Sequence, residues 1–168
     1  FVIIPTGFPF LKTTIAKLLA KKFDKRLVST DEEIAKKTKL SIGKFVQKHG
    51  RDKFREIECD VIESVSGLDE CIFDAGGGII TRNENIINLK RNALIVLLTA
   101  DVKTITSRIR SSNRPALTKS NYIDEIKDVL QEREARYKKA ADYIIDTSRL
   151  SPEEVCDLIT HYISMELQ

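Results

Sequence analysis

A lysine followed by two threonines near the start of the chain combines a positive charge with two hydroxyl groups. Lys12, Thr13 and Thr14 come after an apolar run, residues 1–4, and at the beginning of a segment with helical periodicity, residues 13–23. A lysine and a hydroxyl in this place end a phosphate-binding loop, where the lysine reaches the transferred phosphate and the first hydroxyl holds Mg²⁺. The pattern therefore predicts nucleotide contacts at all three residues and a magnesium ligand at Thr13.

The loop before Lys12 has few glycines. A complete loop of this kind reads Gly-x-x-x-x-Gly-Lys, because its backbone takes left-handed angles and approaches the phosphates closely. Counting back from Lys12, Leu11 and Thr6 occupy the two glycine positions, and Gly7 lies one place away. Gly7 is the remaining glycine that can contact a nucleotide. Taken alone, Lys12-Thr13 is more often a coincidence than a nucleotide site.

Two carboxylates follow the next two apolar runs. Asp31 comes after residues 26–28, and a carboxylate in the cleft at the strand ends can orient a substrate hydroxyl and accept its proton. The alternative interpretation of Asp31 is a helix N-cap, because Asp is favoured there. Asp74 directly follows residues 71–73 and is the second carboxylate expected at this edge.

Three consecutive glycines, Gly76, Gly77 and Gly78, are the most specific local signal in the chain. Glycine loses more backbone freedom on folding than any other residue, and a plain tight turn rarely needs three of them. Their position after a buried strand indicates that another group approaches this backbone closely.

Arginines supply the positive charge that such a site needs. Arg55 and Glu58 lie three residues apart on one helical face and can pair, although this spacing usually means a solvated surface pair. Arg114 lies in the stretch 110–121, which has no packing stripe and indicates a mobile lid. Arg133 is on the helix that follows. Planar guanidinium groups suit the closure of a site over phosphate, whereas each arginine alone is more often a surface residue.

The elements that must position these residues alternate along the chain. Five short apolar runs are expected to form strands: residues 1–4, 26–28, 71–73, 93–98 and 143–145. Longer segments with helical periodicity occupy residues 13–23, 42–65, 85–90, 102–109, 122–140 and 152–165. This alternation predicts βαβ crossovers, and therefore an α/β fold whose mostly parallel sheet is covered by helices on both faces.

The last helix has an explicit start signal. Ser151 can cap it, Pro152 fits its first position, and Glu154 can complete a capping box. No repeat or linker interrupts the chain, so residues 1–168 are expected to form one domain, with the lid at about residues 110–121.

Composition excludes several classes of function. The chain has 168 residues, of which 42% are hydrophobic and 32% charged, as in ordinary globular proteins. A net charge of +3 is too small for wholesale nucleic-acid binding, and no apolar run has the length of a membrane span. Three scattered cysteines and two histidines lack metal-ligand spacing and predict reduced thiols in a cytoplasmic protein.

Taken in order, these segments resemble the shikimate kinase family over nearly the whole chain. That family has a phosphate-binding loop, an Asp-x-Asp after the second strand, a Phe-Arg-x-x-Glu helix, a Gly-Gly-Gly turn, an Arg-Pro lid and an Arg-x-x-x-Tyr helix. The corresponding residues here are Lys12-Thr13-Thr14, Ser29-Thr30-Asp31, Phe54-Arg55-Glu56-Ile57-Glu58, Gly76-Gly77-Gly78, Arg114-Pro115 and Arg133-Glu134-Ala135-Arg136-Tyr137. The resemblance implies a P-loop, nucleoside-monophosphate-kinase-like fold with three α/β/α layers and a five-stranded parallel sheet.

The resemblance also implies a reaction, the transfer of the γ-phosphoryl group of MgATP to the 3-hydroxyl of shikimate in aromatic amino-acid biosynthesis. Asp31 would hold the reacting hydroxyl and act as the base. Arg55 and Arg133 would clamp the shikimate carboxylate, with Glu58 fixing Arg55. The backbone of the glycine turn, Gly76, Gly77 and Gly78, would contact the substrate.

On the nucleotide side, the resemblance assigns the phosphates to Lys12 and the Mg²⁺ ion to Thr13. Arg114 would move in with the lid, and Arg108 corresponds to an arginine that lies against adenine. Gly7 and Thr14 complete the expected nucleotide contacts.

Two departures from the family concern the nucleotide side. The loop has the bulky residues Phe10 and Leu11 where the family is rich in glycine, and Cβ atoms there are expected to obstruct the phosphates. Ser29 stands where the family's first Asp helps to order Mg²⁺ through water. Asp74, at a position where the family usually has a small residue, is the candidate replacement.

Three interpretations stay open on the sequence. The first is an active shikimate kinase, which the complete set of substrate-side residues favours. The second is a kinase-dead relative that serves as a binding or regulatory domain, which the altered loop favours. The third is another small-metabolite kinase of the same fold, such as a gluconate kinase, which the arginine helix and the three glycines disfavour. A monomer is expected by analogy with the family.

Overall fold

The computed structural model describes residues 2–3, 9–111 and 122–166. Its strands are β1 (Val2–Ile3), β2 (Arg26–Ser29), β3 (Cys71–Asp74), β4 (Leu94–Thr99) and β5 (Tyr143–Asp146). They lie in the order β2-β3-β1-β4-β5, and every neighbouring pair is parallel. The predicted α/β fold with parallel strand pairing is confirmed.

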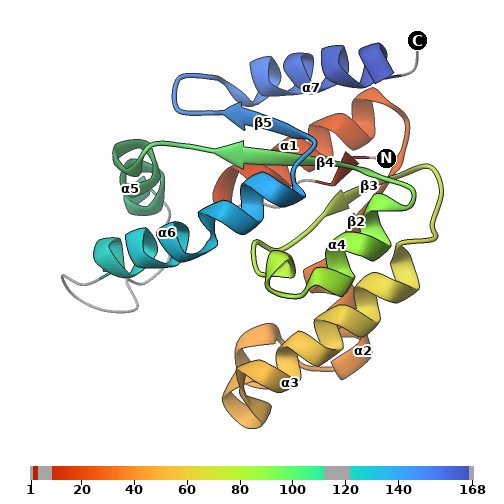
Figure 1. Cartoon of the computed structure of the whole chain (residues 1–168), viewed down its shortest axis with the longest axis vertical. Helices are drawn as coiled ribbons and strands as arrows, with labels where there is room; N and C mark the ends of the chain where they lie inside the picture. The colour runs from red at the N-terminus through yellow and green to blue at the C-terminus, as the bar shows by residue number, and fades with distance from the viewer. Residues whose placement is uncertain (1, 4–8, 112–121, 167–168) are drawn as a thin grey trace.

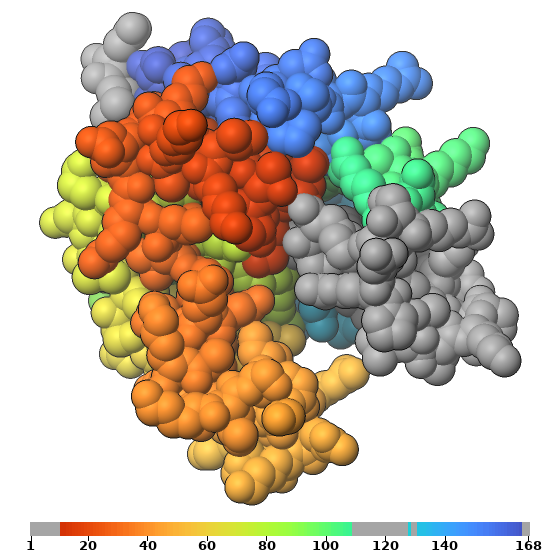
Figure 2. Space-filling view, turned by 180° about the vertical axis from the view of Figure 1, so that it is seen from behind, coloured from red at the N-terminus to blue at the C-terminus, as the bar shows by residue number. Residues whose placement is uncertain are grey.

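Helices connect these strands, and one more helix follows the last strand. They are α1 (Pro9–Lys22), α2 (Thr30–Thr38), α3 (Ile42–Val65), α4 (Asn83–Lys90), α5 (Val102–Ser111), α6 (Tyr122–Ala140) and α7 (Pro152–Glu166), with a short 3-10 helix, η1 (Ile79–Thr81). Figure 1 shows α7 at one end of the molecule and α2 with α3 at the other. Seen from behind, α1 and α7 lie next to each other (Figure 2), and both pack in one apolar cluster with residues of β3, β4 and β5.

Both faces of the sheet are buried, because consecutive strand residues point to opposite sides. In β3, Cys71 and Phe73 join one apolar cluster, whereas Ile72 joins the other. In β4, Ile95 and Leu97 alternate in the same way with Val96 and Leu98. This explains why the strands are nearly uninterrupted apolar runs in the sequence.

The two clusters identify which helices cover each face. Ile15 and Leu19 of α1 pack with Val155 and Ile159 of α7 on one face. The other face is covered by α3, α4 and α6, which contribute Ile62 and Val65, Leu89, and Tyr137 and Ala140. A smaller cluster, with Ile34, Phe45, Phe54 and Val61 at its centre, joins α2 to α3.

Three details compare the expected helices with the observed ones. The capping box of α7 is confirmed, since Glu154 N donates to Ser151 Oγ at 3.2 Å and Ser151 N donates to Glu154 Oε2 at 2.8 Å. Helix α2 was not among the expected helical segments, although the alternative interpretation of Asp31 as an N-cap implied a helix start there. The helix expected over 42–65 is kinked at Gly50, where φ is 84°, a left-handed value that glycine tolerates best.

No helix in the described part of the chain combines the length and the apolar character that crossing a bilayer requires.

Candidate active site

The parallel register of β2 and β3 brings two predicted positions side by side. Ser29 and Asp74 are paired residues at the carboxyl ends of these strands. The segments that follow them, α2 on one strand and the glycine turn on the other, therefore leave the sheet at the same edge. In doubly wound sheets this edge is where ligands bind.

Lys12 and Thr13 reach this edge from the first turns of α1. Lys12 Nζ lies 2.5 Å from Asp74 Oδ1, and Thr13 Oγ1 donates to Asp74 Oδ2 at 2.7 Å. Lys12 and Asp74 are only 7% and 2% exposed, so the pair is shielded from solvent and from screening by salt. Thr14 is exposed, and its predicted nucleotide contact stays a prediction.

Asp31 belongs to the first turn of α2 and is not its cap. Ser29 is the N-cap, because its hydroxyl accepts the Glu32 N–H at 3.4 Å. Asp31 is partly buried, and burial raises its pKa above the ordinary value. Lys12 opposes this rise, Asp74 adds to it, and Arg55 opposes it. The Asp31 carboxylate is therefore within the electrostatic reach of both the lysine end and the arginine end of the site.

Arg55 and Glu58 form the predicted pair on the second half of α3. Arg55 Nη1 donates to Glu58 Oε2 at 2.7 Å, and the Glu58 side chain is 2% exposed. Burial raises the pKa of Glu58, against the nearby guanidinium of Arg55. Because Glu58 is buried, the pair is not the solvated surface contact that its spacing usually indicates.

The group that approaches the glycine turn is the Arg55 side chain. A Cβ atom at Gly78 would collide with the Arg55 guanidinium, and one at Gly76 would stand 3.4 Å from Asp31 Oδ1. The prediction of a close approach to this backbone is confirmed. Of these two, only residue 78 lacks room for a side chain, because the Arg55 guanidinium occupies the space beside it; a Cβ at residue 76 would make an ordinary contact with Asp31.

Arg133 and Tyr137 bring α6 to the same place. Burial raises the pKa values of both Glu58 and Tyr137, and the nearby Arg133 charge opposes both rises. Within the described part of the chain, Arg133 Nε is buried without a hydrogen-bond partner. The Tyr137 hydroxyl donates to the Gly77 carbonyl oxygen at 2.6 Å. The structure thus gathers Arg55 and Arg133 around the buried Glu58.

The remaining nucleotide-side residues lie elsewhere or outside the described residues. Arg108 on α5 donates to Thr147 Oγ1 at 3.0 Å and to Thr147 O at 2.7 Å, beyond the end of β5. Gly7 and Arg114 lie outside the described residues. So does the expected lid at residues 110–121, apart from its first two residues, which end α5.

Two residues of this site had no role in the sequence analysis. Thr30 is buried, and its hydroxyl accepts the Gly76 N–H at 3.4 Å and donates to Asp74 O at 3.5 Å. It joins α2, β3 and the glycine turn. The sequence shows this hydroxyl directly after the second strand. Its hydrogen-bond partners lie more than 40 positions away, so local spacing could not predict them. Tyr137 was noted only as the end of a motif.

Thr13 and Asp74 are suited to hold Mg²⁺. Their side-chain oxygens are hard donors that already lie 2.7 Å apart. Mg²⁺ is usually held by one or two carboxylates while phosphates and water complete its octahedron. Within the described residues no cluster of three or more His, Cys, Asp or Glu side chains could hold a metal ion. The pair fits an ion that arrives with nucleotide phosphates.

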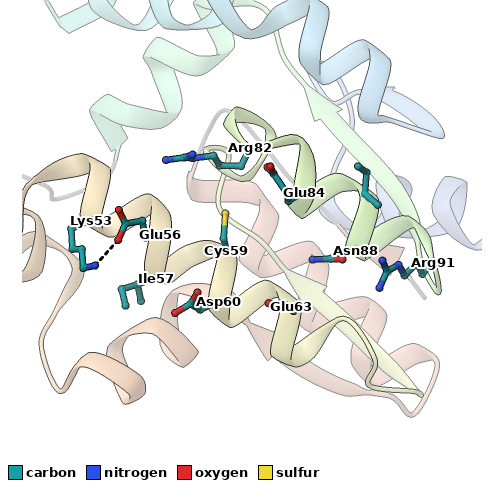
Figure 3. Close-up of a pocket in the computed structure, with 11 residues that line it drawn as sticks. Lys53, Glu56, Ile57, Cys59, Asp60, Glu63, Arg82, Glu84, Asn88 and Arg91 are labelled. Carbon is teal, nitrogen blue, oxygen red and sulfur yellow. Dashed lines mark hydrogen bonds and ion pairs between the residues drawn. The ribbon is translucent and has the colours of Figure 1, made fainter.

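A second hollow in the surface is separate from this site. A groove of about 650 Å³ lies between α3 and α4, and none of the predicted site residues lines it. Figure 3 shows Cys59 of α3 facing Arg82 and Glu84, while Lys53 and Glu56 pair with each other at 2.5 Å. Burial raises the pKa of Cys59, with Arg82 opposing the rise, so its thiol is not activated as a nucleophile.

Comparison with known proteins decides the family. The family model for shikimate kinase matches residues 11–164. The chain belongs to the shikimate kinase family.

Curated relatives support the same assignment. The shikimate kinase of Caldicellulosiruptor saccharolyticus is 39% identical over 159 residues, which are 94% of this chain and 92% of the relative. That of Thermodesulfovibrio yellowstonii is 38% identical over 149 residues, 88% of this chain and 86% of the relative.

Solved structures share the fold. Shikimate kinase from Acinetobacter baumannii, determined in complex with shikimate, superimposes with a TM-score of 0.86 at 28% identity, covering 98% of this chain and 93% of the other. Shikimate kinase from Aquifex aeolicus gives 0.84 at 27% identity, covering 99% and 98%.

Proposed function

We propose that this protein transfers the γ-phosphoryl group of ATP to the 3-hydroxyl of shikimate. The observation that carries the proposal is the arrangement at the carboxyl ends of β2 and β3. There a carboxylate, Asp31, is within electrostatic reach of a lysine end, Lys12 with Asp74, and of an arginine end, Arg55 with Glu58. The lysine end would bind the phosphate donor, the arginine end would bind an acceptor that carries a carboxylate, and Asp31 would be the base within reach of both.

The arginine end suits the carboxylate of shikimate. A guanidinium presents several N–H donors in one plane and binds carboxylates bidentately. Glu58 holds Arg55 at one nitrogen and leaves its other donors available. Arg133 Nε is buried and lacks a partner among the described residues, and an unsatisfied buried donor favours a ligand that supplies the acceptor. We propose that Gly76, Gly77 and Gly78 add backbone contacts to the same substrate.

Asp31 is the proposed base. Its carboxylate is within electrostatic reach of both ends of the site and would hold the 3-hydroxyl and accept its proton. Because burial raises its pKa, it is a stronger proton acceptor than an exposed carboxylate.

The lysine end suits the phosphates. We propose that Lys12 neutralises the transferred group and that Thr14, Gly7, Arg108 and Arg114 complete the nucleotide contacts. Phosphoryl transfer depends on positioning and charge neutralisation, which these residues supply. When bound, Mg²⁺ would neutralise phosphate charge; Thr13 and Asp74 are its proposed ligands.

A coupled assay of ADP release with ATP, Mg²⁺ and shikimate tests the proposal directly. We expect turnover with shikimate and none with gluconate, a result that distinguishes a shikimate kinase from a gluconate kinase of the same fold. Calorimetry with shikimate alone and with MgATP alone should show normal binding of shikimate and weak but measurable binding of MgATP. Absence of shikimate binding would refute the proposal.

A second candidate is a shikimate-binding domain without turnover. One observation favours it, since the Lys12 ammonium is already neutralised by Asp74 in this structure and the loop before it has few glycines. The two candidates differ in the calorimetry, because the second predicts shikimate binding with no measurable binding of MgATP.

The proposed enzyme is a single domain, with residues 110–121 as its lid, and works as a monomer. The three cysteines are free thiols, which supports a cytoplasmic location because disulfides form in oxidising compartments.

A further inference from the structure

Tyr137 has a hydroxyl group in the site and a ring in the core. Its side chain is 5% exposed and belongs to the apolar cluster that contains Phe73, Ala75, Ile79 and Ile80. The ring is thus fixed by residues just before and just after the glycine turn. Its hydroxyl donates to Gly77 O at 2.6 Å, a short, well-formed contact for this type of bond.

Several hydrogen bonds hold the glycine turn. Among those that the structure describes, the bond from Tyr137 is the one that comes from α6. Thr30 accepts from Gly76 N, and Thr81 Oγ1 donates to Gly78 O at 2.7 Å. These bonds fix the two ends of the turn. The Tyr137 bond fixes the middle residue, whose neighbour Gly78 lies against the Arg55 guanidinium with no room for a Cβ.

Tyr137 also lies one helical turn after Arg133. Residues four apart share one face of a helix, and the Arg133 charge and a hydrogen bond from Arg133 both act on the Tyr137 phenol. Movement of α6 relative to the glycine turn would therefore displace Arg133 and remove the support behind Arg55 together.

We infer that Tyr137 is a positioning residue for the acidic end of the substrate, because its hydroxyl fixes the glycine turn that supports Arg55 and ties that turn to the helix that carries Arg133. The inference rests on the proposed function, since it concerns the same carboxylate site. Tyr137 itself contacts no substrate in this scheme and acts through the two arginines.

The variant Tyr137→Phe keeps the ring in the core and removes only the hydroxyl. Loss of one hydrogen bond of ordinary strength should raise the KM and the Kd for shikimate about threefold to tenfold. The KM for ATP should change by less than about twofold, because the Lys12 end does not contact α6 through this bond.

Two comparisons separate positioning from general loss of stability. Ile159→Val shortens a fully buried side chain on the opposite face of the sheet and serves as the control for a lowered unfolding midpoint. A double-mutant cycle with Arg55→Lys tests the route, because mutations that act through one contact are not additive. In the Arg55→Lys background, the Tyr137→Phe effect on shikimate should shrink to about twofold or less.

The outcomes are distinct. If Tyr137→Phe changed the KM values for shikimate and ATP equally, or if Ile159→Val raised the KM for shikimate as much, Tyr137 would have only a structural role. Either result would overturn the inference. Additive effects with Arg55→Lys would also overturn it. Shikimate binding by the wild type with no change in Tyr137→Phe would overturn this inference alone, whereas failure of the wild type to bind shikimate would overturn the proposed function and this inference with it.

Discussion

At the scale of single residues, the site is built from charges that are buried and matched. Asp74 joins Lys12 and Thr13, Glu58 joins Arg55, and the charges of Lys12, Asp74 and Arg55 all act on Asp31. Breaking a buried ion pair leaves an uncompensated charge and costs far more than breaking an exposed one. Substitutions that keep shape while changing charge are therefore the most informative.

Asp31→Asn should separate activity from stability. Loss of a general base should lower kcat by about 10²- to 10⁴-fold. Burial raises the folded-state pKa of Asp31 above 3.8. Between 3.8 and the raised pKa the folded state binds more protons than the unfolded state, so wild-type stability falls as the pH rises through this range. The neutral amide removes that cost, and its unfolding midpoint should exceed the wild type's at pH 7.

The stability difference should vanish below the ordinary carboxyl pKa of 3.8, where Asp31 is protonated in both states. Glu32→Gln, an exposed neighbour in the same helical turn, is the control. A thermal unfolding series between pH 3 and 8 measures both. If the wild type instead became more stable than Asp31→Asn as the pH rises, the ionised Asp31 carboxylate would stabilise the fold, and the predicted pH dependence would be wrong.

Arg133→Ala should weaken shikimate binding roughly ten- to a hundredfold, because a hydrogen bond to a charged group contributes about 1.5–3 kcal/mol. Arg136→Ala is the matched control. It lies on the same helix, is exposed, and donates to Thr81 O at 3.3 Å. Isothermal titration with shikimate checks the pair, and equal losses in both variants would show that the helix and not the Arg133 guanidinium was affected.

Asp74→Asn should weaken the Mg²⁺ dependence of turnover while shikimate affinity stays nearly unchanged. The amide removes the charge that pairs with Lys12 and that would attract the metal. Asp157→Asn is the control, since Asp157 pairs with Lys22 at 2.6 Å but is exposed. A magnesium titration of ATP turnover is the measurement. Equal loss of magnesium dependence and shikimate affinity would indicate a structural role for Asp74.

At the scale of elements, the turn between β3 and η1 depends on the absence of side chains. A Cβ at Gly78 meets the Arg55 guanidinium, whereas a Cβ at Gly43, in α3, meets nothing within 4 Å. Alanine at the two positions therefore separates the effect of contact with Arg55 from the general effect of replacing a glycine.

Gly78→Ala should displace Arg55 and weaken shikimate binding at least about tenfold, as expected for losing a charged hydrogen bond. Gly43→Ala should leave binding unchanged and stabilise the protein by about 0.5–1 kcal/mol, because Ala is favoured over Gly inside helices. Calorimetry and thermal unfolding of both variants provide the test. Unchanged shikimate affinity in Gly78→Ala would show that Arg55 moves aside without consequence.

Periodicity predicted most elements, and its failures have physical causes. Helix α2 was missed because Thr30–Thr38 contains one fully buried apolar residue, Ile34, so it has no repeated apolar stripe to detect. The kink in α3 was missed because a single glycine inside a helical pattern does not reveal its φ angle. The cap of α7 was predicted correctly because every partner lies within three residues.

At the scale of the whole molecule, the sequence order of the motifs predicted their meeting place, but not their contacts. Parallel strands bring their carboxyl ends to one edge, which places Asp31, Asp74 and the glycines together. The partner of Lys12 lies 62 positions away and that of Gly77 lies 60 positions away. Such pairings depend on the strand register and on helix packing, which composition and spacing do not encode.

The altered loop leads to the last prediction, which concerns how α1 begins. Helix α1 starts at Pro9, so Phe10 and Leu11 already lie in its first turn, and Leu11 packs against the cluster between α1 and α7. In a glycine-rich phosphate-binding loop these positions let the backbone approach the phosphates closely. In this chain the same positions belong to a helix, and Leu11 contributes to its packing. We therefore expect shikimate to bind normally and MgATP to bind weakly.

Glycine at both Phe10 and Leu11 should then tighten MgATP binding and raise kcat together, with shikimate affinity unchanged. The cost is stability, because each glycine in a helix is less favourable than alanine by about 1 kcal/mol and the buried part of Leu11 is lost as well. Leu18→Gly on the same helix, partly buried in the same cluster, is the control for stability alone. Tight MgATP binding by the wild type, at an ordinary kinase rate of about 1–100 s⁻¹, would show that these bulky residues do not obstruct the phosphates, and the double-glycine variant would then only lose stability.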